Sequence, residues 1–125
     1  MKKNNKGFSL VELIVVVLIM GIIAVALAPQ VMKWVGKART NSDSNTMKDI
    51  KSAIQVAIAD AQTEPGYTVT ALSETVYDAS GIAGIPNTTL RAKIQEVTGE
   101  DYSATKADGS AFKFTINSSG VVTVY

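Results

Sequence analysis

The first feature of the chain is a long apolar run near its start. From Phe8 to Ala28, 21 residues, the only polar side chains are Ser9 and Glu12. As a helix this run is about 32 Å long, which matches a hydrocarbon core of roughly 30 Å. The pattern therefore predicts a helix of membrane length. A carboxylate in such a segment is costly in lipid, so Glu12 is predicted to be functional.

The apolar run by itself allows two interpretations. One is a membrane anchor, with Lys2, Lys3 and Lys6 held in the cytoplasm and the C-terminus outside. The other is a secretory signal peptide cleaved after the small residues that end at Ala28. Pro29 is a poor neighbour for that cleavage, because proline restricts the residue before it. The run is also long for a signal peptide and contains a carboxylate, yet both interpretations stay open on this pattern.

After Pro29 the pattern becomes that of an amphipathic helix. Apolar side chains recur on one face of this helix, and polar side chains occupy the remaining faces. Trp34 is expected at the membrane interface. Thr40 to Thr46 is a polar stretch of poor helix formers, so a break is conceivable, with Thr46 and Asp49 as a capping pair. We favour one long helix that ends near Thr63, because Pro65 and Gly66 cannot continue it. The apolar positions at helical spacing are Val31, Trp34, Val35, Ala38, Met47, Ile50, Ile54, Ala57, Ile58 and Ala61.

The last sixty residues predict a small domain of mixed structure. Tyr67 to Pro86 is expected to be loop, since "SGIAGIP" is too rich in glycine for a regular element. A short helix is predicted from Thr88 to Val97, with Asn87 as its cap and Gly99 at its end. Three strands are predicted after it, joined by turns at "KADGS" and "NSSG". They are Tyr102–Thr105, Ala111–Ile116 and Val121–Tyr125.

These elements define the expected fold class. In the middle strand Phe112, Phe114 and Ile116 share one face, which should pack on the apolar stripe from Met47 to Ile58. The fold is therefore expected to be α+β. A long N-terminal helix, with a transmembrane half and an amphipathic half, packs on a small C-terminal antiparallel sheet of about three strands.

Composition excludes several kinds of chemistry. The net charge of +1 depends on the three lysines before Gly7, without which 9 basic residues face 11 acidic ones. That balance offers no basic patch for nucleic acid. The chain has no His and no Cys, which excludes Ser-His-Asp catalysis, thiol chemistry, typical zinc sites and disulfides. We therefore predict no enzyme, no catalytic residue, no metal and no cofactor.

Two weaker motifs in the C-terminal part are interpreted structurally. Asn87 and Asn117 each begin a glycosylation acceptor pattern, but a helix cap and a turn explain them. Glu100, Asp101 and Asp108 lack the ordered spacing of a calcium loop and are expected to be solvated surface.

The start of the chain resembles the class III signal of type IV pilins and pseudopilins. The resemblance rests on Gly7-Phe8-Ser9-Leu10-Val11-Glu12 after the lysines, followed by "LIVVVLIMGIIAVALAP", and covers roughly the first 60 residues. It implies that a prepilin peptidase cleaves between Gly7 and Phe8 and that the new amine of Phe8 is methylated. It also implies that Gly21 and Pro29 loosen the helix during assembly, whereas Pro29 taken by itself is equally explained by a kink at the membrane exit.

The same resemblance gives Glu12 a partner. Cleavage creates an amine at Phe8, four residues away and about 6 Å along the helix axis. The Glu12 carboxylate can pair with the amine of its own chain or, as the resemblance implies, with that of a neighbouring subunit. Opposite charges about 4 Å apart attract by roughly 4 kcal/mol at an effective dielectric of 20, so the pair can set the axial register of an incoming subunit.

The resemblance also predicts the organisation of the chain. Residues 1–7 are the leader, 8–29 the transmembrane and filament-core helix, and 30–64 the amphipathic half. Residues 65–125 form a globular α+β part completed by packing on 47–63. The lack of a C-terminal disulfide loop departs from many pilins.

Two functions fit these features. The first is a subunit of a type IV pilus that serves adhesion, aggregation or twitching movement. The alternative is a pseudopilin of a secretion or DNA-uptake filament. Either way, the expected partners are further copies of the chain, the prepilin peptidase and N-methyltransferase, and an inner-membrane assembly platform with its ATPase. The subunit is expected in the cytoplasmic membrane before assembly and at the cell surface afterwards.

Overall fold

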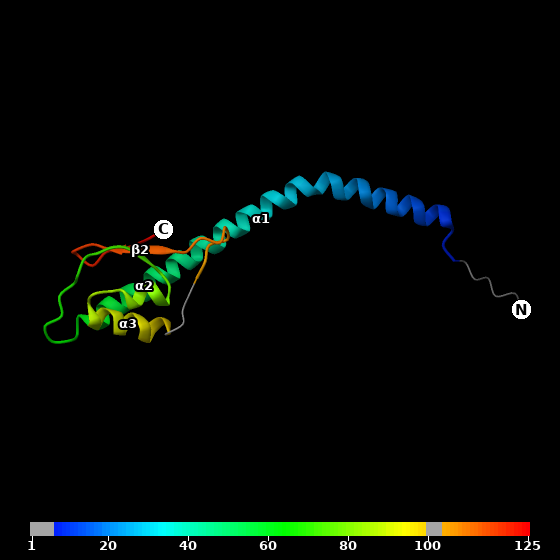
Figure 1. Ribbon diagram of the computed structural model, residues 1–125. Helices are drawn as coiled ribbons and strands as arrows, with labels where there is room; N and C mark the ends of the chain where they lie inside the picture. The colour runs from blue at the N-terminus through cyan, green and yellow to red at the C-terminus, as the bar shows by residue number, and fades with distance from the viewer. Residues whose placement is uncertain (1–6, 100–103) are drawn as a thin grey trace, which may run out of the picture. The chain divides into compact units, whose positions relative to one another are not determined.

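The computed structural model describes residues 7–99 and 104–125 (Figure 1). The chain divides into two compact units, one that ends at Ala38 and one from Arg39 to Tyr125. We call them the N-terminal unit and the C-terminal unit. The fold is α+β, as the pattern predicted. The described elements follow the order α1 (Leu10–Ala61), β1 (Leu72–Val76), α2 (Ala79–Ala83), α3 (Thr88–Thr98), β2 (Lys113–Ile116) and β3 (Val122–Val124).

Helix α1 is continuous from Leu10 to Ala61 and includes Pro29. The prediction of one long helix is thus confirmed, and its end lies two residues before the expected Thr63. The break considered at Thr40–Thr46 does not occur. Thr46 is not a cap but an interior residue, whose hydroxyl donates to the Ser42 carbonyl one turn earlier at 3.0 Å. Because the hydroxyl finds its hydrogen-bond partner within α1, this polar stretch need not interrupt the helix.

The C-terminal part of α1 supplies one side of the core of the C-terminal unit. Ile50, Ile54, Ala57 and Ile58 are buried, and Met47 packs at their margin, as the helical spacing predicted. They join the apolar face of β2, where Phe114 is fully buried and its ring meets Tyr77 edge-on at 6.0 Å between centroids. Burying an aromatic side chain of this kind contributes about 1.5–3 kcal/mol. This core makes the stripe on α1 a packing surface.

The sheet has three antiparallel strands in the order β1-β2-β3. Phe114 lies opposite Thr75 of β1 and opposite Val124 of β3. The "NSSG" turn joins β2 to β3, with Gly120 at φ +80°, a left-handed conformation that glycine adopts without strain. The "KADGS" turn closes a single bridge between Thr105 and Ala111.

The strand predicted at Tyr102–Thr105 is not found in its described half, Ala104 and Thr105. Tyr102 and Ser103 lie outside the described residues, and Thr105 forms only an isolated bridge. The third strand is instead β1, in a segment predicted to be loop. An irregularity in the pairing between Leu72 and Thr75 breaks the alternation of buried and exposed side chains, so the usual strand pattern is absent from the sequence.

The glycine-rich segment was also predicted wrongly, because it contains α2. Asp78 caps this helix by accepting a hydrogen bond from the Gly81 N–H at 2.6 Å, and Ile82 is buried. A Cβ on Gly81 would lie 2.0 Å from the Val76 carbonyl oxygen. The glycine therefore serves close packing of α2 on β1 rather than flexibility.

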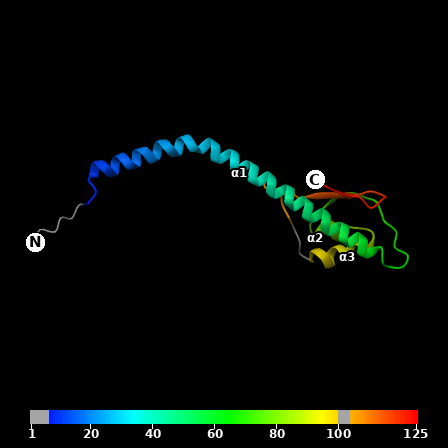
Figure 2. The same ribbon diagram turned by 180° about the vertical axis from the view of Figure 1, so that it is seen from behind.

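Helix α3 agrees with its prediction. Asn87 is the N-cap and accepts from the Leu90 N–H at 3.0 Å, while Gly99 ends the helix at φ +86°. Asn117 likewise accepts from the Ser119 and Val121 N–H groups in its turn. Both asparagine side chains therefore have the structural roles expected of them. Figure 2 shows α2 and α3 from behind, both beside the C-terminal part of α1.

Candidate functional site

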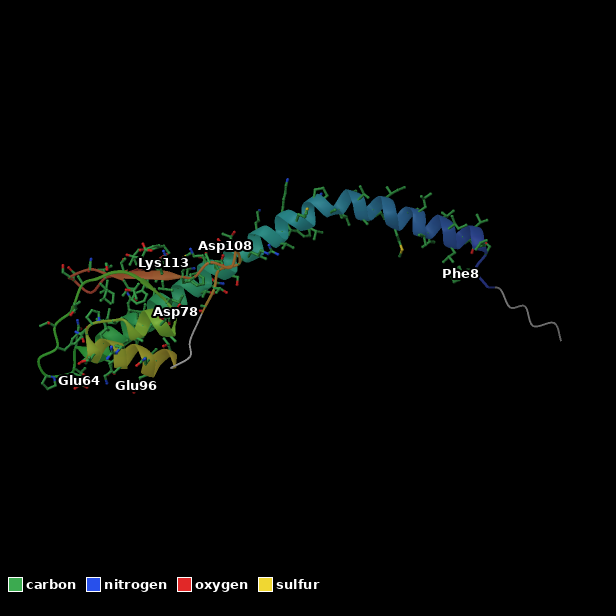
Figure 3. All side chains as sticks on the ribbon, in the orientation of Figure 1. Phe8, Glu64, Asp78, Glu96, Asp108 and Lys113 are labelled. Atoms are coloured by element: carbon green, nitrogen blue, oxygen red, sulfur yellow. The ribbon has the colours of Figure 1, made fainter. Side chains whose placement is uncertain are left out.

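The candidate site lies at the beginning of α1, in the N-terminal unit. Gly7 and Phe8 precede the helix, and Phe8 is 93% exposed (Figure 3). Ser9 begins the helix as its cap, because its Oγ accepts from the Glu12 N–H at 3.2 Å and its carbonyl accepts from the Leu13 N–H at 3.2 Å. The peptide bond between Gly7 and Phe8 is thus held outside the helix, two residues before its first full turn.

Ser9 is a residue that the sequence reasoning missed. Its signal was present, since Ser-x-x-Glu at Ser9–Glu12 matches the capping box that opens many helices. The cap fixes where α1 starts, and therefore fixes Glu12 in the first turn. There the carboxylate lies near the positive end of the helix dipole, which favours a negative charge.

The Glu12 side chain is exposed and unpaired. Within residues 7–99 and 104–125 its carboxylate makes no ion pair or hydrogen bond. The surrounding surface is apolar, and a charge against such a surface is stabilised only by an opposite charge or by water. The site therefore presents one carboxylate that requires a partner.

The rest of the N-terminal unit is an exposed apolar surface. Each large apolar side chain from Phe8 to Val35 is at least 44% exposed. An 18-residue window of α1 has a mean hydropathy of 3.1, which makes this helix long and apolar enough to cross a membrane. In water such a surface would aggregate, so lipid or other apolar helices must cover it.

Gly21 and Pro29 lie within this surface. A Cβ on Gly21 would have no neighbour within 4 Å, and the residue lines a shallow groove together with Val17, Leu18, Ile22 and Val25. Pro29 lies in the helix interior, where it lacks the N–H that would bond to the carbonyl of Val25. A proline there costs about 3 kcal/mol relative to alanine. The two residues therefore weaken α1 locally without ending it.

Of the three acidic residues considered for calcium, only Asp108 lies within the described residues. Glu100 and Asp101 lie outside the described residues, and Asp108 accepts hydrogen bonds from the N–H and Oγ of Ser110. These bonds lower the pKa of Asp108. Among residues 7–99 and 104–125 no group of three acidic side chains is arranged to hold a metal ion.

Comparison with known proteins identifies the N-terminal segment. The model of the family "Prokaryotic N-terminal methylation motif" matches residues 2–28. Three relatives, each a type IV major fimbrial protein FimA of Dichelobacter nodosus, are 31% identical to the chain over 62 residues. The similarity covers 50% of this chain and about 40% of the length of each relative. No solved structure matches the chain.

These findings agree with the exposed apolar helix and its single carboxylate. The chain carries the N-terminal methylation motif and is similar to type IV major fimbrial proteins over half of its length.

Proposed function

We propose that this chain is a structural subunit of a type IV pilus, assembled into a helical filament through its N-terminal helix. The observation that carries the proposal is the exposed carboxylate of Glu12, the one charged group in the membrane-length apolar run from Phe8 to Ala28. The named relatives are major fimbrial proteins, which supports the same function. Their similarity is confined to half of this chain, so the adhesive or motile role of the filament forms part of the proposal.

Processing is the first step of the proposed function. A prepilin peptidase cleaves between Gly7 and Phe8, and the new amine of Phe8 is methylated. The exposed, non-helical position of Gly7 and Phe8 supports access by the peptidase. Residues 1–7 are then lost as the leader, and residues 8–29 remain as the anchor in the cytoplasmic membrane with the C-terminus outside.

Assembly exchanges lipid around α1 for identical helices. The amine of Phe8 becomes the partner of Glu12 on a neighbouring subunit, because a carboxylate left unpaired among apolar helices is strongly unfavourable. Gly21 and Pro29 allow the helix to lengthen locally during assembly. Residues 30–64 continue the helix, and residues 65–125 form the outer part of each subunit. The peptidase, an assembly platform and its ATPase are the partners of these steps.

A pseudopilin of a secretion or DNA-uptake filament is the second candidate. It uses the same N-terminal motif, which matches residues 2–28 here. A pseudopilin filament is short and stays near the cell envelope, whereas a pilus extends from the surface.

The test is to shear filaments from cells that express the chain and to measure the mass of their subunits. The proposal expects long filaments whose main component begins at Phe8 and carries one extra methyl group. Subunits that begin at Pro29 and are secreted without filaments would establish the signal-peptide interpretation. Processed subunits that stay in the envelope and are absent from sheared material would favour the pseudopilin.

A further inference from the structure

The C-terminal unit has a groove between α1 and the edge of its sheet. Its volume is about 300 Å³, and we call it the lysine groove. Strand β3 is one edge of the sheet and forms one wall. The residues that line the groove are Ser44, Met47, Lys48 and Lys51 of α1 and Val121 to Val124.

Among the described residues, the two lysines of this groove have no counter-ion. Within the described residues neither ammonium forms an ion pair. Lys48 and Lys51 are three residues apart on α1, so they are neighbours and repel each other. The positions three and four residues from each of them hold no acidic side chain, and Asp49 is too near in sequence to share their face. Two positive charges therefore remain uncompensated.

The β3 wall adds unpaired backbone groups. Lys113 and Tyr125 exchange both N–H to carbonyl bonds across β2 and β3, and Asn117 donates to the Val121 carbonyl. By the alternation of an antiparallel ladder, the backbone groups of Val122 and Val124 then face the outer edge. Exposed strand edges of this kind bind other chains or are covered in natural proteins. The groove thus combines two ammonium groups with free N–H donors, which is a site for carboxylates.

The same unit carries a surplus of carboxylates elsewhere. Asp60, Glu64 and Glu96 surround Lys93, whose Nζ lies 2.9, 3.6 and 3.8 Å from their oxygens. Lys93 remains charged, because the hydrogen bond that its ammonium group donates to the Asp60 carboxylate is the main cause that raises the pKa of Lys93. One cation cannot neutralise three anions, so this carboxylate cluster keeps a charge of about −2. Its side chains are 49–72% exposed, and Figure 3 shows Glu64 and Glu96 on the same part of the unit.

The other acidic side chains of the C-terminal unit are engaged or isolated. Among the described residues, Asp43 accepts from the Ala107 N–H, Glu74 pairs with Lys113, and Asp78 caps α2. Asp108 accepts a hydrogen bond from the Ser110 hydroxyl, and Asp49 is an isolated carboxylate that could match only one of the two lysines. Within residues 39–99 and 104–125, the carboxylate cluster is therefore the surplus of negative charge that matches the lysine groove.

We propose that the lysine groove of one subunit receives the carboxylate cluster of a second copy of this chain. The two patches are different surfaces, so the contact is heterologous: each subunit offers its groove to one neighbour and its cluster to another. Repetition of such a contact gives an open helical array unless the rotation closes a ring. The inference rests on the proposed filament and adds the contact that its outer units make. Complementary charges of this kind set partner choice and register more than affinity.

The first experiment uses charge reversal in cells that assemble filaments from this chain. Lys48→Glu/Lys51→Glu should lower the sheared-filament yield roughly tenfold, since one disfavoured contact per subunit is repeated along the filament. Glu64→Lys/Glu96→Lys should lower the filament yield to a similar extent. This variant keeps the ion pair between Asp60 and Lys93. The matched control is Lys48→Arg/Lys51→Arg, which keeps the charges and should keep the yield. Amounts of processed subunit in the membrane must be equal in all four strains.

Co-expression of the two reversed variants distinguishes a docking contact from a folding defect. In each variant the groove and the cluster carry charges of the same sign, so copies of one variant cannot dock on one another. The groove of each variant is, however, opposite in charge to the cluster of the other variant. Filaments that contain both variants should therefore return, with subunits of both masses. Loss that persists on co-expression would overturn the proposal.

Cysteine cross-linking tests the contact directly, because the chain has no cysteine of its own. A Lys48→Cys/Glu64→Cys subunit should give a ladder of disulfide-linked multimers on a non-reducing gel of oxidised filaments. About 20 Å of helix rise separates Lys48 from the end of α1, so the two cysteines cannot join within one chain. Each single variant should give no species larger than a dimer.

The outcomes separate this inference from the proposed function. If the wild-type chain forms filaments but the charge reversals are neutral and no ladder forms, the docking contact is refuted and the pilus function stands. If the wild-type chain forms no filament, the proposed function fails and this inference fails with it. A groove that binds another acidic protein would leave filaments intact in the reversed variants, and that result also refutes the proposal.

Discussion

The Oγ of Ser9 accepts a hydrogen bond from the backbone N–H of Glu12 at 3.2 Å. This bond satisfies one of the donors that every helix leaves free at its first turn. It also fixes the residue at which α1 begins, so the peptide bond after Gly7, where cleavage is proposed, stays outside the helix. One side chain thereby relates the proposed processing site to the charged residue of the proposed assembly site.

Replacing Ser9 by alanine should loosen the first turn of α1. Loss of such a cap costs about 0.5–2 kcal/mol, which corresponds to a roughly 2- to 30-fold faster exchange of the Glu12 amide hydrogen. Hydrogen exchange of the full chain in detergent micelles would measure this. Ser9→Thr keeps the hydroxyl and should exchange like the wild type. An unchanged rate in Ser9→Ala would show that the bond does not stabilise the turn.

Replacing Glu12 by valine should stop filament growth without affecting membrane insertion or cleavage. The carboxylate has no partner within the described part of its own chain, and the proposed partner is the Phe8 amine of a neighbour. Valine leaves that amine unpaired among apolar helices, which is strongly unfavourable. The measurement is the yield of sheared filaments from cells with equal amounts of processed subunit. A wild-type yield from Glu12→Val would refute the register hypothesis.

Gly81 should tolerate no side chain. A Cβ there would lie 2.0 Å from the Val76 carbonyl oxygen, so α2 must move away from β1. Overpacking of this kind costs about 1–3 kcal/mol. For a unit of this size we expect Gly81→Ala to lower the Tm by about 10 °C. The Tm would be measured by near-ultraviolet circular dichroism of the full chain in micelles.

The matched control is Gly84→Ala at the end of the same helix. Gly84 has φ −77°, and a Cβ there would lie 3.4 Å from its first neighbour, so the residue fits without strain. Its Tm should stay near that of the wild type. Equal effects of the two substitutions would contradict a special role for Gly81.

The free energy of unfolding of the C-terminal unit should fall in acid, partly because Glu74 becomes protonated. Its hydrogen bond with Lys113, then the charge of Lys113 and the Tyr125 hydroxyl, lower the pKa of Glu74 below its ordinary value of 4.5. The unfolded chain therefore binds a proton at higher pH than the native state does, and stability is lost as the pH falls through the native pKa. In Glu74→Gln the fall of Tm below pH 4.5 should be shallower than in the wild type.

A second variant, Lys113→Gln, tests whether the ion pair with Lys113 causes this pH dependence. In Lys113→Gln the partner is absent, so the further change Glu74→Gln should leave the slope of Tm against pH nearly unchanged. A slope that still changes would show that another group sets it.

The sequence by itself determined those features that depend on local pattern. The apolar run fixed the membrane-length part of α1, because its composition needs no tertiary contact to be recognised. Asn87 and Gly99 fixed the ends of α3 through caps that involve only neighbouring residues. The spacing of Ile50, Ile54 and Ile58 predicted the buried face of α1, and the alternation at Phe112, Phe114 and Ile116 predicted that of the β2 segment. The motif from Gly7 to Glu12 gave the family.

Only the tertiary structure decided the third strand and the groove. Strand β1 pairs with β2 from about forty residues away, and its irregular register at Leu72–Thr75 hides the alternation that would reveal a strand. In the sequence, Gly81 counted against a regular element, but a glycine is needed there because α2 packs closely on the backbone of β1. Lys48 and Lys51 could be read only as solvated helix surface until β3 was placed beside them. These features depend on which distant segments meet, and a local pattern carries no record of that.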